Sequence, residues 1–277
     1  MCDNTANLIK ARYVVTSTSS EQALNWQALQ PELSITELSA EKADFWSLQK
    51  HATKAISLFL KQPRRSLLVL KADDQAEYAD LLAELIRQEQ PERSIFGVNY
   101  VVEQGDSFSF PRIYTEPAQS HADNFAAQGD VLKALHADQF SLFGSVRVHP
   151  SSQDILLTPG LVHQANGGVL ILSAATMLSQ FDLWQRLKHI LQTQTFDWYS
   201  AHPFKTLPCD IPSYPLNLKV VILGNRTEIA TLGELEEDLY SLADYAEIES
   251  YYSVAQPKAQ ENWANYVLAL ASKYELD

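Results

Sequence analysis

Residues 66–86 have the layout of a phosphate-binding loop but lack the residues that would bind the phosphate. The apolar run 67–70 predicts a buried strand, and apolar residues spaced i, i+3, i+4, i+7 and i+8 over 78–86 predict a helix with one buried face. A working loop between such elements supplies glycines, whose N–H groups surround a phosphate, and then Lys and Ser/Thr. Here the loop reads Lys71-Ala72-Asp73-Asp74 and contains no glycine.

The two loop carboxylates occupy the position that an anion would need. Asp73 and Asp74 can cap the following helix, whose N-terminus favours negative charge. A nucleotide phosphate at the same place would meet like charges, and each such pair about 4 Å apart costs about 4 kcal/mol at an effective dielectric constant near 20. That cost corresponds to roughly a thousandfold loss of affinity. We therefore predict that Lys71, Asp73 and Asp74 mark a degenerate nucleotide site, although an ordinary strand–helix unit explains the same residues.

Composition narrows the class of protein. With 277 residues, of which 46% are apolar, the chain can form one large or two modest packed domains. Its formal charge of −13 disfavours binding to nucleic acid and to anionic lipid. Two distant cysteines, Cys2 and Cys209, give neither a disulfide framework nor a metal-site spacing. Because no signal peptide or membrane-length apolar run is visible either, we expect a cytoplasmic protein.

Strand-like and helix-like patterns alternate along the chain. Strands are predicted at 67–70, 94–102, 169–172, 218–223 and 246–252. Helices are predicted to end at Pro63, to span about 122–138 and 176–192, and to begin at Pro257, and hairpins are predicted around Gly105-Asp106 and over 143–157. Buried strands that alternate with helices predict an α/β fold, a mostly parallel sheet with helices on both faces.

Four strings in the second half resemble the AAA+ module of Lon-type proteases, and in particular its LonB-like branch. They are Leu142-Phe143-Gly144, PGLVHQANGGVLIL at 159–172, WQRLK at 184–188 and LKVVILGN at 218–225. The resemblance covers roughly residues 40–277. It implies an N-terminal arm at 1–40, a degenerate AAA+ core of the P-loop NTPase type at 41–253, and the start of a truncated helical lid at 254–277.

The resemblance implies a ring-forming, ATP-driven unfoldase joined to a Ser–Lys peptidase domain. Carried over residue by residue, the phosphate-binding lysine and threonine have no match. The strand that should end in Asp-Glu, to hold Mg²⁺, ends instead in Leu172-Ser173-Ala174. Asn225 matches the sensor asparagine, and the arginine finger expected within 239–244 is missing. No catalytic residue and no metal ligand can be assigned.

We therefore expect an ATPase-like module that is inactive in hydrolysis and serves in substrate capture, subunit contact and positioning of a C-terminal peptidase domain. No cofactor is expected in this fragment, although active family members use ATP and Mg²⁺. The expected partners are unfolded or damaged proteins, the peptidase domain and other copies of the chain, but neither nucleic acid nor a membrane. Two alternatives stay open: an active ATPase that uses Lys71 and Asn225, and a scaffold or regulator without proteolytic function.

The segment 194–216 is the predicted interaction surface, because prolines interleave its aromatic residues. We expect Phe196, Trp198, Tyr199 and Phe204 to contact a neighbouring subunit or an unfolded client. The alternative is that these rings pack under the loop as a satellite core. His163, within the family string, is expected to bond a loop backbone, and the acidic run 234–238 is expected to form a solvated face.

Overall fold

The computed structural model describes residues 44–72, 75–90, 98–103, 112–118, 125, 129–149, 151, 154–199, 207 and 209–274. The chain divides into two compact units. The larger comprises residues 54–248, and the smaller combines the residues up to 53 with those from 249 onward. The arm predicted at 1–40 lies outside the described residues, and the domain boundaries drawn from sequence stay predictions.

The larger unit is built on a five-stranded sheet in which every neighbouring pair is parallel. In spatial order the strands are β11 (Ala243–Glu247), β1 (Leu67–Lys71), β10 (Lys219–Gly224), β7 (Val169–Ser173) and β4 (Val131–Ala134). Although β1 comes first in the chain, it lies inside the sheet, between β10 and β11. The predicted mostly parallel sheet is confirmed.

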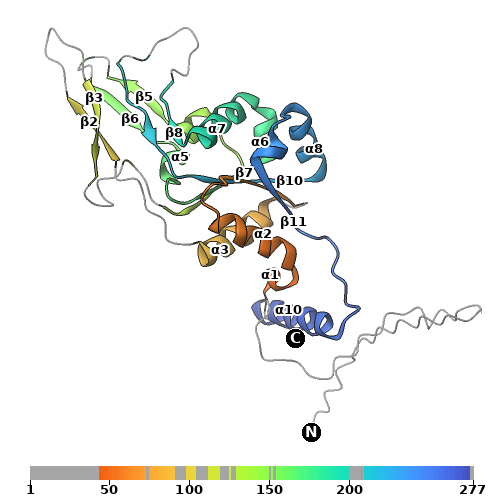
Figure 1. The fold of residues 1–277 in the computed structure, drawn as a ribbon. Helices are drawn as coiled ribbons and strands as arrows, with labels where there is room; N and C mark the ends of the chain where they lie inside the picture. Colours follow the sequence, from red (N-terminus) through yellow and green to blue (C-terminus); the bar gives the residue numbers. More distant parts are fainter. Residues whose placement is uncertain are drawn as a thin grey trace, which may run out of the picture. The chain divides into compact units, whose positions relative to one another are not determined.

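Helices cover both faces of this sheet, as parallel connections require. One face carries α3 (Gln75–Glu89) and the part of α2 (Lys50–Lys61) that belongs to the larger unit, and the other carries α6 (Ala174–Ser179), α7 (Phe181–Thr193) and α8 (Arg226–Leu235), as Figure 1 shows. The short helix α9 (Leu239–Leu242) leads directly into β11. The carboxyl and amino ends of the parallel strands therefore form two opposite edges, each bounded by helix termini.

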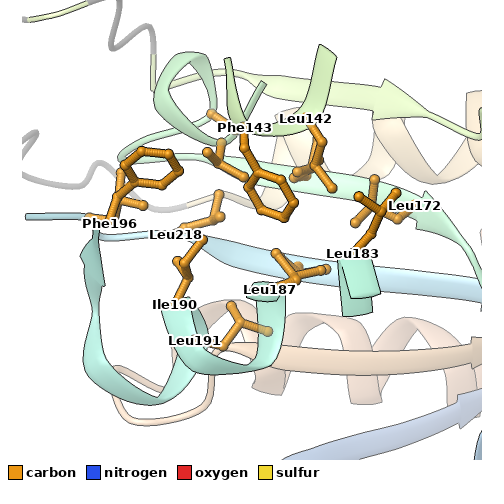
Figure 2. Packing of buried hydrophobic residues seen from close by; sticks show 14 of the residues in the cluster. Leu142, Phe143, Leu172, Leu183, Leu187, Ile190, Leu191, Phe196 and Leu218 are labelled. Atoms are coloured by element: carbon orange, nitrogen blue, oxygen red, sulfur yellow. The ribbon is translucent and has the colours of Figure 1, made fainter. Parts of the chain in front are cut away.

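The main core lies between the sheet and α7. Leu183, Leu187, Ile190 and Leu191 of α7 point at the strands, and Phe143 closes the side of this layer (Figure 2). The central strands β1, β7 and β10 are buried almost throughout, because helices cover both of their faces. This double burial is why each of them appears in the sequence as a continuous apolar run.

A buried lysine joins the sheet to the end of α2. Lys219, the first residue of β10, is only 5% exposed. Its ammonium donates hydrogen bonds to the carbonyl oxygens of Phe59, Gln62 and Arg65 at 2.5, 2.5 and 2.7 Å. The last carbonyl groups of a helix have no partner within the helix, and a cation suits the negative end of its dipole. Lys219 therefore caps α2 from a strand about 160 positions downstream.

The described residues of the larger unit also form three two-stranded sheets and two more short helices. β2 (Val98–Glu103) pairs with β3 (Arg112–Pro117), β5 (Ser145–Val148) with β6 (Ile155–Thr158), and β8 (Thr195–Phe196) with β9 (Tyr214–Pro215), all antiparallel. α4 (Gln139–Phe143) precedes β5, and α5 (Leu161–Gln164) follows β6. Both predicted hairpins are confirmed in their strands, while the turn around Gly105-Asp106 lies outside the described residues.

The smaller unit pairs α1 (Phe45–Leu48) with α10 (Pro257–Lys273), and the ring of Phe45 lies 6.4 Å from that of Tyr266. Asp44 caps α1 by accepting the N–H of Ser47 at 2.8 Å. Pro257 occupies the first turn of α10, as predicted. Within the described ranges, every helix is too short or too polar to cross a bilayer.

Three predicted elements need correction. The helix expected at about 122–138 is wrong, because residues 131–134 form β4 instead, an edge strand paired with β7. The last strand lies at 243–247 rather than 246–252, in register with β1. The helix expected at 176–192 is two helices, which meet at Gln180.

Candidate functional site

The carboxyl edge of the central sheet is where an α/β fold places its ligands. β1 ends there with Lys71, whose ammonium forms an ion pair with Glu247 at the end of the neighbouring β11. Ala72 follows, buried, and its N–H donates to the carbonyl oxygen of Gly224 at 3.0 Å. Lys71 therefore already has an anionic partner within the chain. Asp73 and Asp74 lie outside the described residues.

Asn225, matched to the sensor position, is the N-cap of α8. Its side-chain oxygen accepts the N–H of Glu228 at 2.9 Å, and the Glu228 carboxylate accepts the N–H of Asn225, also at 2.9 Å. This reciprocal pair is a capping box, which satisfies two backbone donors at the start of the helix. This helix-capping role is enough to explain why an asparagine stands at position 225. A contact between Asn225 and nucleotide stays a prediction.

At the end of β7, small residues stand where the resemblance to Lon-type AAA+ modules implies an acidic pair. Ser173 is 3% exposed and is followed at once by α6. A Cβ added to Gly224 would lie 2.7 Å from the Cβ of Ala174, so β10 passes as close to the start of α6 as a glycine allows. α6 also packs against α8. The carboxyl ends of β7 and β10 are therefore held together by close helix packing.

The family string at 159–168 forms a structural clamp. His163 Nδ1 accepts the N–H of Gly160 at 3.2 Å, which confirms the predicted bond to a loop backbone. Asn166 Oδ1 accepts the N–H of Asn217 at 2.7 Å, and the Asn217 carbonyl accepts the N–H of Gly167 at 3.0 Å. The Gly168 backbone approaches the carbonyl oxygen of Asp130 so closely that a Cβ would lie 2.0 Å from it. The string thus fixes the starts of β4, β7 and β10 relative to one another.

His163 is a neutral, fully buried imidazole. Since Nδ1 accepts a hydrogen bond, Nε2 carries the proton, and no described residue accepts it in a conventional hydrogen bond. Its ring stacks on Trp198 at 5.1 Å and meets Phe196 edge-on at 4.2 Å. Burial lowers the pKa of His163 to about 3, and the nearby positive charge of Arg186 contributes in the same direction. At neutral pH this residue is a packing element without charge.

The predicted interaction surface is only partly at the surface. Phe196 is 0% exposed and Trp198 is 7% exposed, so the expectation that these two rings contact a partner is corrected in favour of the packing alternative. The Trp198 indole donates to the hydroxyl of Tyr100, a residue of β2, at 3.1 Å. Tyr199 is 52% exposed, and the Arg186 guanidinium lies 4.9 Å from the centre of its ring. Phe204 lies outside the described residues.

One member of the acidic run is buried, contrary to the solvated face predicted from the sequence. Glu236 is 6% exposed and accepts hydrogen bonds from the Trp184 indole at 3.0 Å, the Gln185 amide at 3.1 Å and the Lys188 ammonium at 2.6 Å. Burial alone would raise the pKa of Glu236, but the three hydrogen bonds outweigh it and lower the pKa. The WQRLK string therefore serves to bind this carboxylate.

No metal centre is found among the residues that the structure describes, because no three His, Cys, Asp or Glu side chains gather there in a ligand set. Arg186, in the same string as Trp184, is half-buried between aromatic rings, with its guanidinium 4.3 Å from the centre of the Phe143 ring. Burial lowers the pKa of Arg186 to about 10, and its NH2 group donates to the Asp197 carbonyl at 2.9 Å. Arg186 thus supports the same aromatic cluster as His163.

Comparisons with known proteins find similar sequences and folds. Residues 129–244, from the start of β4 to β11, match the family described as LonB-like, AAA domain. A Lon protease homolog of Haemophilus influenzae is 67% identical to this chain, and the match covers 93% of this chain and 43% of the homolog. A Lon protease homolog of Escherichia coli is 37% identical, and the match covers 73% of this chain and 33% of the homolog. A chain of the complex between subunits BchI and BchD of magnesium chelatase is 15% identical, with a TM-score of 0.46 over 85% of this chain and 77% of that chain.

The chain spans less than half the length of the two Lon protease homologs that it matches. The four sequence segments that resemble Lon-type proteases all lie in the larger unit. They are the segments that hold β4, β7, β10 and α7 in place relative to one another. The family match over residues 129–244 and the similarity to the two Lon protease homologs support a Lon-like AAA module in this chain.

Proposed function

We propose that this module belongs to a Lon-type serine protease, that it does not hydrolyse ATP, and that it serves in client capture, subunit contact and positioning of the peptidase domain. The observation that carries the proposal is the end of β7. Ser173 and Ala174 stand where a carboxylate pair would hold Mg²⁺ and orient water, and α6 begins there without a gap. A methyl group cannot bind Mg²⁺, and a neutral hydroxyl supplies neither the negative charge nor the second oxygen of a carboxylate.

Two further features of the same edge support the proposal. The Lys71 ammonium is already paired with Glu247, so a triphosphate would have to displace a carboxylate. Asn225 is engaged in the capping box of α8. The described residues of this edge therefore do not fit MgATP, and we derive no hydrolytic step through it.

Calorimetric titration of the 277-residue chain with ATP and Mg²⁺ tests the proposal. We expect no saturable binding below about 1 mM, because the favourable contacts of a phosphate loop are absent. Binding in the micromolar range would overturn the proposal and favour an active ATPase that uses Lys71 and Asn225. In that case Lys71→Ala would abolish the binding, whereas Lys61→Ala, at an exposed lysine of α2, would leave it unchanged.

Client capture is tested separately, at the exposed member of the aromatic segment. We expect a permanently unfolded protein to bind the chain and Tyr199→Ala to weaken that binding about threefold to tenfold, as the loss of one exposed aromatic anchor does. The matched control is Tyr251→Ala, because Tyr251 is 73% exposed but lies in the smaller unit. Equal effects of the two substitutions would contradict a capture role for Tyr199.

A further inference from the structure

A cavity of about 420 Å³ opens at the amino edge of the central sheet, opposite the edge that carries Ser173 and Asn225. Its lining comes from three places: the segment that enters β1, the middle of α7, and α9. The lining residues are Arg64, Arg65, Ser66, Leu67, Trp184, Lys188, Leu191, Gln192, Ser241 and Leu242. Its volume lies within the range of small-molecule sites.

The walls of the cavity are tied together by hydrogen bonds. The Arg65 guanidinium donates to the carbonyl oxygen of Ser241 at 2.8 Å, which joins the entry of β1 to α9. The hydroxyl of Ser66 donates to the carbonyl oxygen of Leu191 at 3.3 Å, which joins the same segment to α7. The cavity is therefore pre-formed, and a ligand would not have to order its walls.

Two of the three cations that line the cavity have carboxylate partners within the chain. Arg65 is paired with Asp244 at 3.6 Å, and Lys188 is paired with Glu236 at 2.6 Å and with Asp238 at 3.3 Å. Arg64 is exposed, and none of the described residues forms an ion pair or hydrogen bond with it. Arg64 therefore offers the cavity a guanidinium that no described residue engages.

We propose that this cavity binds a small organic monoanion, with its carboxylate on Arg64 and an apolar body against Leu67, Leu191 and Leu242. A guanidinium binds a carboxylate through two parallel N–H bonds, which fixes its orientation. The paired carboxylates of Asp238 and Asp244 would repel a second negative charge, so a phosphate dianion or a nucleotide fits less well. This site lies at the other edge of the sheet from the family's nucleotide position, so the inference does not depend on the proposed function.

Titration of the full chain with phenylbutyrate tests the proposal, with phenylbutanol as its neutral counterpart. We expect saturable binding of the acid, at least about tenfold weaker binding of the alcohol, and no binding of inorganic phosphate or adenosine monophosphate at the same concentrations. The acid should also shift the indole N–H resonance of Trp184, which lines the cavity. That resonance is assigned by its loss in Trp184→Phe.

Arginine variants locate the binding. Arg64→Ala should weaken binding of phenylbutyrate about tenfold and Arg64→Glu should abolish it, while Arg147→Ala, at an exposed arginine of β5, should leave it unchanged. Because Arg64 is exposed, both substitutions leave the core intact. No saturable binding of the acid below about 10 mM, tighter binding of the nucleotide than of the acid, or equal effects at Arg64 and Arg147 would each overturn the proposal.

Discussion

His163 gives the larger unit a stability that depends on pH. Its pKa is about 3 in the folded chain, against 6.5 for an unperturbed histidine, so the unfolded state binds the extra proton between these values. The contribution of His163 to the free energy of unfolding is fully present above pH 6.5 and is lost as the pH falls toward 3. For a fully buried imidazole the loss amounts to about 1.4 kcal/mol for each pH unit inside that window.

We therefore expect His163→Gln to reduce the slope of unfolding free energy against pH by about 1 kcal/mol per unit between roughly pH 6 and pH 4. Glutamine can still accept the Gly160 N–H bond but does not titrate. His189→Gln is the control, since the His189 side chain is 50% exposed. Chemical denaturation at a series of pH values measures the slope. An unchanged slope in His163→Gln would mean that other groups carry the pH dependence.

Glu236 is the second residue whose replacement should lower the stability of the larger unit. Glu236→Ala leaves the Trp184 indole, the Gln185 amide and the mostly buried Lys188 ammonium without their shared acceptor. We expect a loss of about 3 kcal/mol in the free energy of unfolding, measured by denaturant titration. Glu237→Ala, the exposed neighbour, should change it by less than about 0.5 kcal/mol. Similar effects at both positions would contradict the assigned network.

Where α4 meets α5, two glycines set the spacing. A Cβ on Gly160 would lie 2.3 Å from the Gly144 nitrogen and 2.4 Å from the Leu142 carbonyl oxygen, and these are backbone atoms that cannot swing aside. We expect Gly160→Ala to reduce the free energy of unfolding by about 3 kcal/mol. Circular dichroism would show this loss as a lower midpoint of thermal unfolding.

Gly233→Ala is the matched substitution inside α8. Its Cβ would meet the hydroxyl of Tyr240 at 2.7 Å, but this side chain is 65% exposed and can move. Alanine also favours the helix interior by about 1 kcal/mol, so we expect no loss or a small gain. A large loss of stability in Gly233→Ala, or no loss in Gly160→Ala, would show that the contacts assigned to these glycines do not determine the effect of the substitutions.

The strands buried on both faces could be predicted from the sequence, and the edge strands could not. β1, β7 and β10 are continuous apolar runs because helices cover both of their faces. β4 has four residues, one of them an exposed lysine, and its stretch has a local pattern that equally suits a helix. Its pairing with β7, nearly forty positions away, overrides that preference.

The candidate site was predictable only where it depends on local pattern. The missing glycines and acids, and the backbone bond of His163, follow from residues close together in the chain. The burial of Glu236 does not, because four neighbouring acids look alike and its partner Lys188 lies 48 positions away. Phe196 and Trp198 are buried for a similar reason. Trp198 packs against Tyr100 of β2, 98 positions away, and Phe196 pairs with Tyr214 of β9.

At the scale of the whole molecule, net charge makes a prediction about nucleic acid. A charge of −13 repels a polyanion, and the exposed cations do not gather into a stripe along the sequence. We expect no binding of a labelled DNA duplex in fluorescence anisotropy at about 0.15 M salt and micromolar protein. Saturable, salt-sensitive binding under these conditions would contradict the expectation.

The position of β1 has a consequence for how the chain folds as it emerges from the ribosome. Among the described strands, β1 pairs with β10 and β11, which begin at residues 219 and 243. Until those residues have been synthesised, an apolar strand made early has no neighbour in the sheet. Translation must therefore proceed almost to the end of this unit before β1 is sheltered, and a nascent chain stalled short of residue 219 would present it to chaperones.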